Sequence, residues 1–162
     1  MPKSIEASLD YREMLSTANI GAIRRISGIR SANKPNRAVE TSQWTRDCEA
    51  AAAEYVVARH LGICWNLGCG SSLYAGDVGE CEVKHTLLDR GSLIVRPEHA
   101  AERIYILVTG EMPVYQIRGW YWGYDAKTDK YWNEMIQEPA YMVGQEYLND
   151  MSEIVKELVG EV

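Results

Sequence analysis

The spacing of apolar and polar residues gives its clearest helical signal over residues 45–61. Four consecutive alanines favour a helix there, and the carboxylates of Asp47 and Glu49 suit the positive end of its dipole. Gly62 can adopt the left-handed conformation that ends a helix. The pattern therefore predicts a helix that begins near residue 45 and ends at Gly62.

Two further helices are expected near the ends of the chain. Residues 5–16 show a helical pattern, whereas residues 17–43 are rich in Gly, Ser, Asn and Arg and are expected to be irregular or short-helical. A helix over residues 145–159 would place four apolar side chains on one face, those of Leu148, Met151, Val155 and Leu158.

Between these helices the apolar pattern becomes that of β-strands. Residues 103–109 form a continuous apolar run, which is typical of a central strand covered on both faces. Shorter strands are expected at residues 63–67, 80–86, 92–96 and 114–122. The sequence thus predicts an α/β protein, with a mixed central β-sheet flanked by helices.

Length and composition indicate one structural domain. The chain has 162 residues, 46% of them hydrophobic and 25% charged, and no apolar run is long enough to span a membrane. We divide it into an N-terminal helix and basic segment, residues 1–43, and a core, residues 44–162. Because the N-terminus lacks the apolar stretch of a signal peptide, we expect a cytoplasmic protein.

Charge is unevenly distributed along the chain, whose formal net charge is −6. Residues 133–162 are strongly acidic, whereas residues 24–46 contain a single acidic residue, Glu40. The basic segment could contact DNA phosphates, or it could be a solvated loop. Its candidate DNA contacts are Arg24, Arg25, Arg30, Lys34 and Arg37.

The candidate catalytic and metal-binding residues are concentrated between Asp77 and Lys84. On an extended strand Glu82 and Lys84 share a face, while Cys81 and Val83 point the other way. Two carboxylates and a lysine are suited to hold a magnesium ion and to orient an attacking water. The alternative is a solvated strand face with Asp77 as an ordinary turn residue.

Asp77 needs a change of chain direction to reach Glu82. Glu82 lies five positions after Asp77, an odd spacing that would put the two on opposite faces of one continuous strand. Gly76 and Gly79 allow a turn or bulge that returns Asp77 to the same place.

Other chemistry-bearing residues have ordinary explanations. The four cysteines are expected to be small buried hydrophobes, although His60, Cys64 and Cys69 could form a metal site. His85 is expected to be a satisfied core or edge histidine. The aromatic residues between Tyr115 and Trp132 could stack on unpaired bases, but packing in the sheet or a homo-oligomer contact explains them better.

The order of these elements and motifs resembles the PD-(D/E)XK nuclease superfamily, and in particular small phage-encoded proteins of that group. The likeness covers residues 44–148. It is carried by Trp44-x-x-Asp47-x-Glu49-Ala-Ala-Ala-Ala-Glu54 followed by Ala58 and Leu61-Gly62, by Asp77-Val-Gly with Glu82-Val-Lys84, by Tyr105-Ile-Leu-Val108, and by Ile117-Arg-Gly-Trp120.

The resemblance implies a restriction-endonuclease-like core and a metal-dependent nuclease. Asp77, Glu82 and the main-chain carbonyl of Val83 would bind Mg²⁺ or Mn²⁺, Lys84 would serve the nucleophile, and Glu54 would complete the acidic cluster. From its position alone, Glu54 could instead be an exposed partner of Arg46 or Arg59.

The chain departs from the superfamily pattern around Asp77. Gly76 stands where proline is usual, and the gap from Asp77 to Glu82 is short, so Glu80 could be the ligand instead. Around Glu54, the alanines Ala50 and Ala53 stand where small phage relatives often have glycine.

We therefore expect a phage-encoded deoxyribonuclease that acts on DNA in the cytoplasm of the host cell. The alternative is a nuclease-fold protein without activity that binds DNA or inhibits a host protein, for which the acidic surface would act as a mimic.

Overall fold

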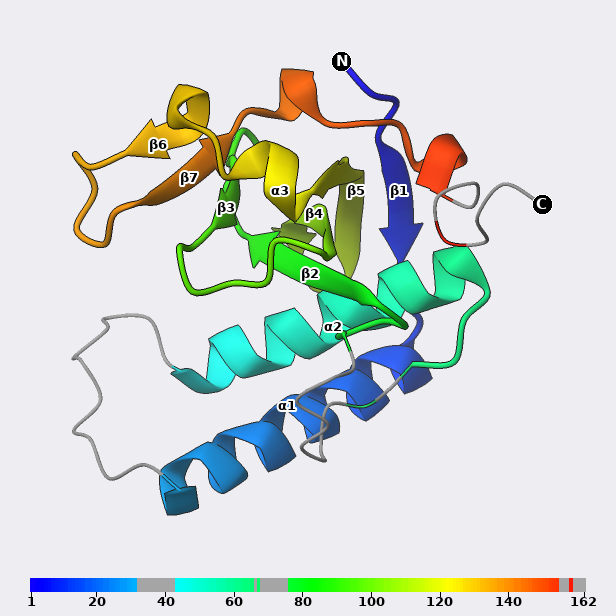
Figure 1. The fold of residues 1–162 in the computed structure, drawn as a ribbon. Helices are drawn as coiled ribbons and strands as arrows, with labels where there is room; N and C mark the ends of the chain where they lie inside the picture. The colour runs from blue at the N-terminus through cyan, green and yellow to red at the C-terminus, as the bar shows by residue number, and fades with distance from the viewer. Residues whose placement is uncertain (32–42, 66, 68–75, 155–157, 159–162) are drawn as a thin grey trace.

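The computed structural model describes the chain except for residues 32–42, 66, 68–75, 155–157 and 159–162. It is a mixed α/β structure (Figure 1). The helices are α1 (Tyr11–Ser31), α2 (Gln43–Leu61) and the short α3 (Gly123–Ala126). The strands are β1 (Ile5–Ser8), β2 (Cys81–Thr86), β3 (Leu93–Val95), β4 (Ile104–Glu111), β5 (Val114–Trp122), β6 (Trp132–Asn133) and β7 (Ala140–Val143).

The main sheet has four strands in the order β1-β5-β4-β2. β4 and β5 form an antiparallel hairpin, β1 pairs antiparallel with β5, and β2 pairs in parallel with β4. The sheet is therefore mixed, as the sequence predicts. β2 is an edge strand of this sheet, so one of its edges is open to other groups.

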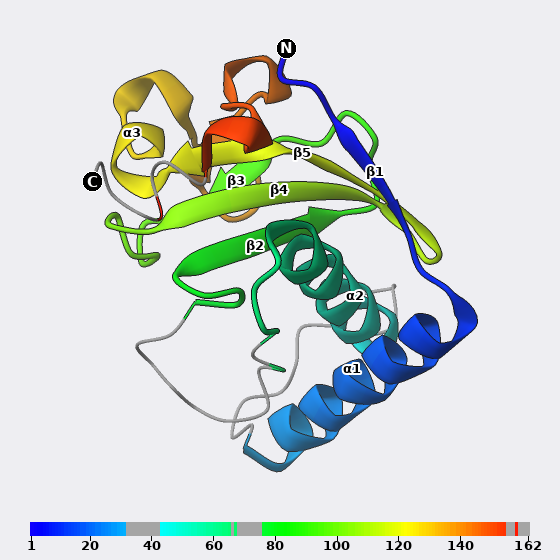
Figure 2. The same cartoon turned by 90° about the vertical axis from the view of Figure 1, so that its right-hand side faces the viewer.

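Both long helices lie on one face of the main sheet (Figure 2). α2 packs directly against the strands, and α1 packs against the outer side of α2. The small side chains of α2, including the fully buried Ala52 and Ala53, allow helix and sheet to approach closely. The resulting core also contains Val56 from α2, Val83 from β2 and Ile106 from β4.

A second, three-stranded sheet covers the other face of the main sheet. Its strand order is β3-β7-β6, and α3 lies beside it. This layer encloses a second core around Tyr105 and Leu107 of β4. Residues 104–109 are thus buried on both faces, which confirms the prediction for this run. The sequence did not indicate that a sheet would form this layer.

The predicted boundaries at the N-terminus were wrong. Residues 5–8 form a strand, and the helix begins at Tyr11 and extends to Ser31 through the segment expected to be irregular. Asp10 caps this helix, because its carboxylate accepts the backbone N–H of Glu13 at 2.8 Å. The carboxylate of Glu13 in turn accepts the backbone N–H of Asp10 at 2.8 Å. Gly21 in α1 faces Cys48 of α2 so closely that the two helices can pack tightly together.

Two more predicted elements differ in the structure. Residues 63–65 and 67 form no strand. Instead of one helix from residue 145, the chain makes two short 3₁₀ turns, Gln145–Tyr147 and Met151–Glu153, because Asn149 pairs with Trp120 through backbone bonds of 2.8 and 3.1 Å. Leu148 and Met151 consequently enter different cores. Val155 lies outside the described residues.

The remaining predicted elements are confirmed. α2 ends at Gly62, which has φ +66° and is followed by a bond from the Ile63 N–H to the Ala58 carbonyl at 3.0 Å. The strands predicted at 80–86, 92–96 and 114–122 correspond to β2, β3 and β5. Within the described part of the chain, neither long helix has the apolar stretch that crossing a membrane requires.

Candidate functional site

A tight turn brings Asp77 back against β2. Val78 and Cys81 exchange backbone bonds of 3.1 and 3.0 Å, and the Gly76 N–H donates to the Gly79 carbonyl at 3.0 Å. Gly79 has φ +59°, and a Cβ on Gly76 would lie 2.4 Å from the Cys81 carbonyl oxygen. The chain therefore makes the turn that the two glycines were predicted to allow. Proline at position 76 could not make its N–H bond.

The carboxylate of Asp77 reaches the open edge of β2. Its Oδ2 accepts the backbone N–H of Val83 at 2.9 Å. Burial and the nearby charges of Glu54 and Glu82 raise the pKa of Asp77 to about 6, although the Val83 bond and Lys84 act in the opposite direction. Asp77 therefore contacts β2 at Val83, the residue between Glu82 and Lys84.

Glu82 and Lys84 share one face of β2, as predicted, while Cys81 and Val83 are buried on the helix side. Lys84 Nζ lies 3.7 Å from Glu82 Oε2 and 5.6 Å from the ring centre of Tyr105 on the neighbouring strand. Glu82 also forms an ion pair with Arg103. The ammonium group thus lies beside a carboxylate that already has a second cationic partner.

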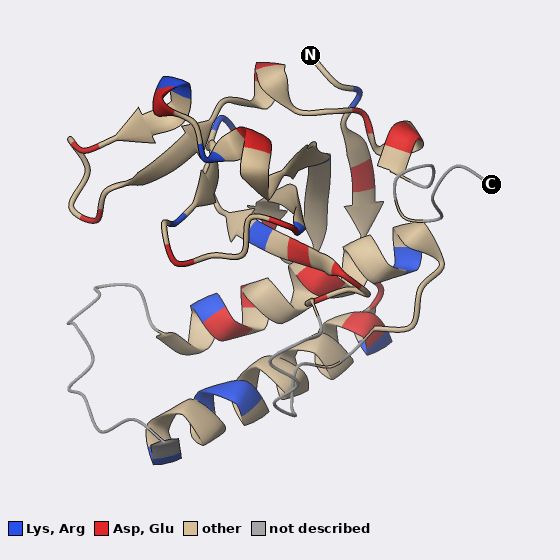
Figure 3. Ribbon diagram, in the orientation of Figure 1, with Lys and Arg blue, Asp and Glu red and all other residues tan. Residues whose placement is uncertain are grey.

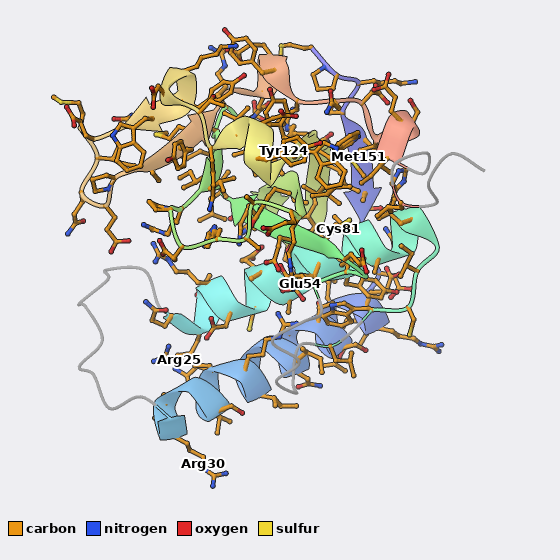
Figure 4. All side chains as sticks on the ribbon, in the orientation of Figure 1. Arg25, Arg30, Glu54, Cys81, Tyr124 and Met151 are labelled. Carbon is orange, nitrogen blue, oxygen red and sulfur yellow. The ribbon has the colours of Figure 1, made fainter. Side chains whose placement is uncertain are left out.

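Glu54 lies on α2, which packs on the face of β2 that carries Cys81 and Val83, and is only 5% exposed (Figure 4). Arg24 of α1 binds both of its carboxylate oxygens, at 2.7 and 2.6 Å. The indole N–H of Trp65 adds a third bond at 3.1 Å. The partners suggested by spacing were wrong, since Arg59 pairs with Glu13 instead.

Electrostatic and aromatic neighbours complete the site. His99 stacks on Tyr105 at 6.1 Å, and its Nδ1 accepts the backbone N–H of Arg96. Burial and the neighbouring Lys84 lower the pKa of His99. Sequence reasoning overlooked Arg103, Tyr105 and His99. Only the parallel register, in which Tyr105 lies beside Glu82, could have indicated them.

Among the described residues of the basic segment, Arg24 contributes directly to this site. Arg24 points inward to Glu54, whereas Arg25 and Arg30 lie on α1 and Arg30 points away from the rest of the protein (Figure 4). Figure 3 shows basic positions along the C-terminal half of α1, below the acidic positions of α2 and β2. Lys34 and Arg37 lie outside the described residues.

The alternative ligand, Glu80, lies elsewhere. It is exposed in the turn and lines a hollow of about 60 Å³ with Glu102, Ile104, Trp122 and Leu158. Asp77, in contrast, is partly buried, and the charges of Glu54 and Glu82 help to raise its pKa. The geometry therefore favours Asp77 over Glu80 as the partner of these two carboxylates.

The cysteines and aromatic residues agree only partly with expectation. Cys81 is buried, but Cys64 is exposed, which corrects the prediction for that residue, and Cys69 lies outside the described residues.

Tyr115, Trp120 and Tyr131 are buried, which confirms a packing role for them, whereas Tyr124 and Trp132 are exposed. His85 contacts the Gly110 carbonyl at 2.7 Å and packs edge-on to Tyr115, which confirms the edge-histidine prediction.

The donor chemistry of the site fits Mg²⁺ or Mn²⁺, since Glu54, Asp77 and Glu82 supply hard carboxylate oxygens. Val83, the expected main-chain ligand, is bonded to Asp77 through its N–H. Among the residues that the structure describes, however, no three acidic, histidine or cysteine side chains are grouped closely enough to hold an ion. Binding at Glu54 would have to compete with Arg24, and binding at Glu82 with Arg103.

Comparison of the chain with protein-family models, with curated proteins and with solved structures gave no match. The fold is accordingly described as mixed α/β, and a nuclease-like core remains a prediction.

Proposed function

We propose that this protein is a metal-dependent deoxyribonuclease with a PD-(D/E)XK-like core. The observation that supports the proposal is the position of Asp77, whose carboxylate is bonded to β2 at Val83 and is influenced by the charges of Glu54 and Glu82. Glu54 comes from α2, Asp77 from the turn before β2, and Glu82 and Lys84 from β2 itself. A carboxylate whose pKa is raised by burial and by neighbouring carboxylates is a candidate functional group.

Each residue would have a definite task. Asp77 and Glu82 would hold the ion, with the Val83 carbonyl and Glu54 as further ligands. Bound Mg²⁺ or Mn²⁺ would stabilise the charge that develops on the scissile phosphate. Lys84, already oriented by Glu82 at 3.7 Å and by the Tyr105 ring, would position the attacking water and limit its movement.

The proposed setting follows from the sequence resemblance. The protein would act on DNA in the cytoplasm of a phage-infected cell, during phage replication, recombination or degradation of host DNA. The second candidate is a nuclease-fold protein that binds DNA or a host protein without cleaving DNA. It is favoured by the pairing of Glu54 with Arg24 and of Glu82 with Arg103, and by the net charge of −6.

Incubation with single-stranded, duplex and branched DNA in Mg²⁺ or Mn²⁺ tests the proposal. We expect cleavage by the wild type and a loss of at least about 100-fold in Glu82→Ala and in Lys84→Ala. Both variants should keep the wild-type circular dichroism spectrum, since neither side chain fills the core. Lys3→Ala, which removes an exposed lysine outside the site, is the matched control. Wild-type rates in Lys84→Ala would exclude the assignment.

A further inference from the structure

Arg24 connects three parts of the protein at the proposed site. From α1 its guanidinium binds both oxygens of Glu54 on α2, at 2.7 and 2.6 Å. It also donates to the Leu67 carbonyl, from Nε at 3.0 Å and from Nη2 at 2.7 Å. The side chains of Arg24 and Glu54 are 18% and 7% exposed, so this bidentate pair is largely removed from water.

The pair satisfies Glu54 in the protein without metal. A buried carboxylate needs a positive partner and hydrogen-bond donors, and Glu54 receives two donors from Arg24 and one from the Trp65 indole. Arg24 thus provides the positive charge that a bound metal ion would otherwise provide.

Arg24 and a metal ion cannot both use Glu54 in this geometry without a cost. Both oxygens of Glu54 already accept from Arg24, and a divalent ion placed there would lie within a few ångströms of the guanidinium charge. Repulsion between like charges at such distances in a poorly hydrated site is large. Metal binding therefore favours a state in which Arg24 has left Glu54.

A DNA phosphate is a suitable alternative partner for Arg24. A guanidinium binds phosphate in the same bidentate manner as it binds carboxylate. Arg24 also belongs to the C-terminal half of α1, where basic positions gather (Figure 3). A phosphodiester that approached this side of the site could bind the Arg24 guanidinium in place of Glu54.

We propose that Arg24 couples metal binding to DNA binding: without DNA it pairs with Glu54 and weakens metal binding, and with DNA it moves to a phosphate and releases Glu54 to the metal. This inference rests on the proposed nuclease function. The protein would then bind metal weakly in the absence of DNA and strongly when DNA is bound. The complete metal site would therefore form mainly in the complex with DNA.

Calorimetric titration with Ca²⁺ tests the coupling without requiring turnover. We compare the wild type with Arg24→Gln, and use Arg59→Gln as the matched control, because Arg59 also pairs α1 with α2 but binds Glu13. Arg24→Gln should bind Ca²⁺ about tenfold more tightly than wild type in the absence of DNA. Arg59→Gln should bind as the wild type does.

Added 12-nucleotide DNA, tested single-stranded and as a duplex, should tighten Ca²⁺ binding severalfold in the wild type and clearly less in Arg24→Gln. Equal Ca²⁺ affinity of Arg24→Gln and wild type without DNA would overturn the proposal. So would the absence of Ca²⁺ binding in both proteins. If wild type cleaves DNA while these affinities are equal, the coupling is wrong and the nuclease proposal stands.

A measurement on the wild type covers the case in which Arg24→Gln does not fold. The indole N–H of Trp65 bonds to Glu54, so its NMR resonance reports on this carboxylate. Ca²⁺ with DNA should shift this resonance far more than Ca²⁺ alone at the same concentration. Equal shifts under the two conditions would contradict the coupling, whether or not the protein cleaves DNA.

Discussion

Asp77 is partly buried, at a place where its charged form is unfavourable. Its carboxylate is near Glu54 and Glu82, and its pKa is raised from 3.8 to about 6. The folded protein therefore holds this proton more tightly than the unfolded chain does. The charge on Asp77 therefore lowers the free energy of unfolding at neutral pH. This destabilisation disappears as the pH falls from about 6 to below 4, because the carboxyl group is then protonated in both states.

The substitution Asp77→Asn should consequently stabilise the metal-free protein at high pH. Asparagine keeps an acceptor for the Val83 N–H but carries no charge. We expect its free energy of unfolding at pH 8 to exceed that of wild type by about 2 kcal/mol, and the two proteins to be equal near pH 4. Denaturant unfolding in chelator across this pH range measures the difference. A variant less stable than wild type at every pH would identify Asp77 as an ordinary turn residue.

At the scale of single residues, the sequence indicated the groups but not their partners. The face shared by Glu82 and Lys84 follows from strand geometry, and the return of Asp77 follows from Gly76 and Gly79. The pairing of Glu54 with Arg24, 30 residues away, depends on how α1 packs on α2. No local pattern contains that information.

At the scale of elements, α1 shows how packing overrides local propensity. Gly21 and Gly28 lie within the helix and reduced the sequence signal for it. A Cβ on Gly21 would lie 2.4 Å from the Cα of Cys48, so glycine is needed for α1 to pack on α2, whereas Gly28 has open space around its Cα. The Asp10-to-Glu13 capping box marked the helix start but was overlooked.

These two glycines give opposite predictions for the same substitution. Gly21→Ala should destabilise the protein by about 1–3 kcal/mol, because the backbone of α2 would have to move. Gly28→Ala should stabilise it by about 0.5–1 kcal/mol through its better helix propensity. Thermal unfolding of both variants checks the packing of α1 on α2. Equal effects would show that the two helices are not in this contact.

Strands were predicted better than the closing helix for a physical reason. β4 is enclosed on both faces, so its apolar run appears directly in the sequence. The residues after β7 follow a helical apolar spacing, but the pairing of Asn149 with Trp120 draws the chain alongside β5. A Cβ on Gly119 would lie 2.5 Å from the Asn149 carbonyl, so this close approach depends on glycine.

At the scale of the whole molecule, the N-terminal segment is part of the folded core. β1 extends the main sheet by pairing with β5, and α1 supplies Arg24 to the site. The protein carries a net charge of −6, yet basic positions gather on α1 (Figure 3). A polyanion would therefore be expected to approach the site from the α1 side.

The salt dependence of DNA binding tests this direction of approach. Replacing Arg25 and Arg30 together by Gln should weaken duplex binding and reduce the slope of log affinity against log salt by about 2, since each lost phosphate contact removes roughly 0.9. Adding Arg24→Gln should reduce the slope further. Arg90→Gln, which alters an exposed arginine near the β2–β3 connection, is the control. An unchanged slope in the double variant would place the DNA elsewhere, with the aromatic residues near Trp120 the next region to test.

The measurement that tests the proposed metal site most directly is thermal unfolding of wild type and Asp77→Asn, each in chelator and in millimolar Mn²⁺. A ligand that binds only the folded protein raises its melting temperature in proportion to how fully the site is occupied. We predict that Mn²⁺ raises the melting temperature of wild type, and that Asp77→Asn begins at an equal or higher melting temperature in chelator but gains less from Mn²⁺. A wild type that does not respond to Mn²⁺, together with a destabilised Asp77→Asn, would contradict the account.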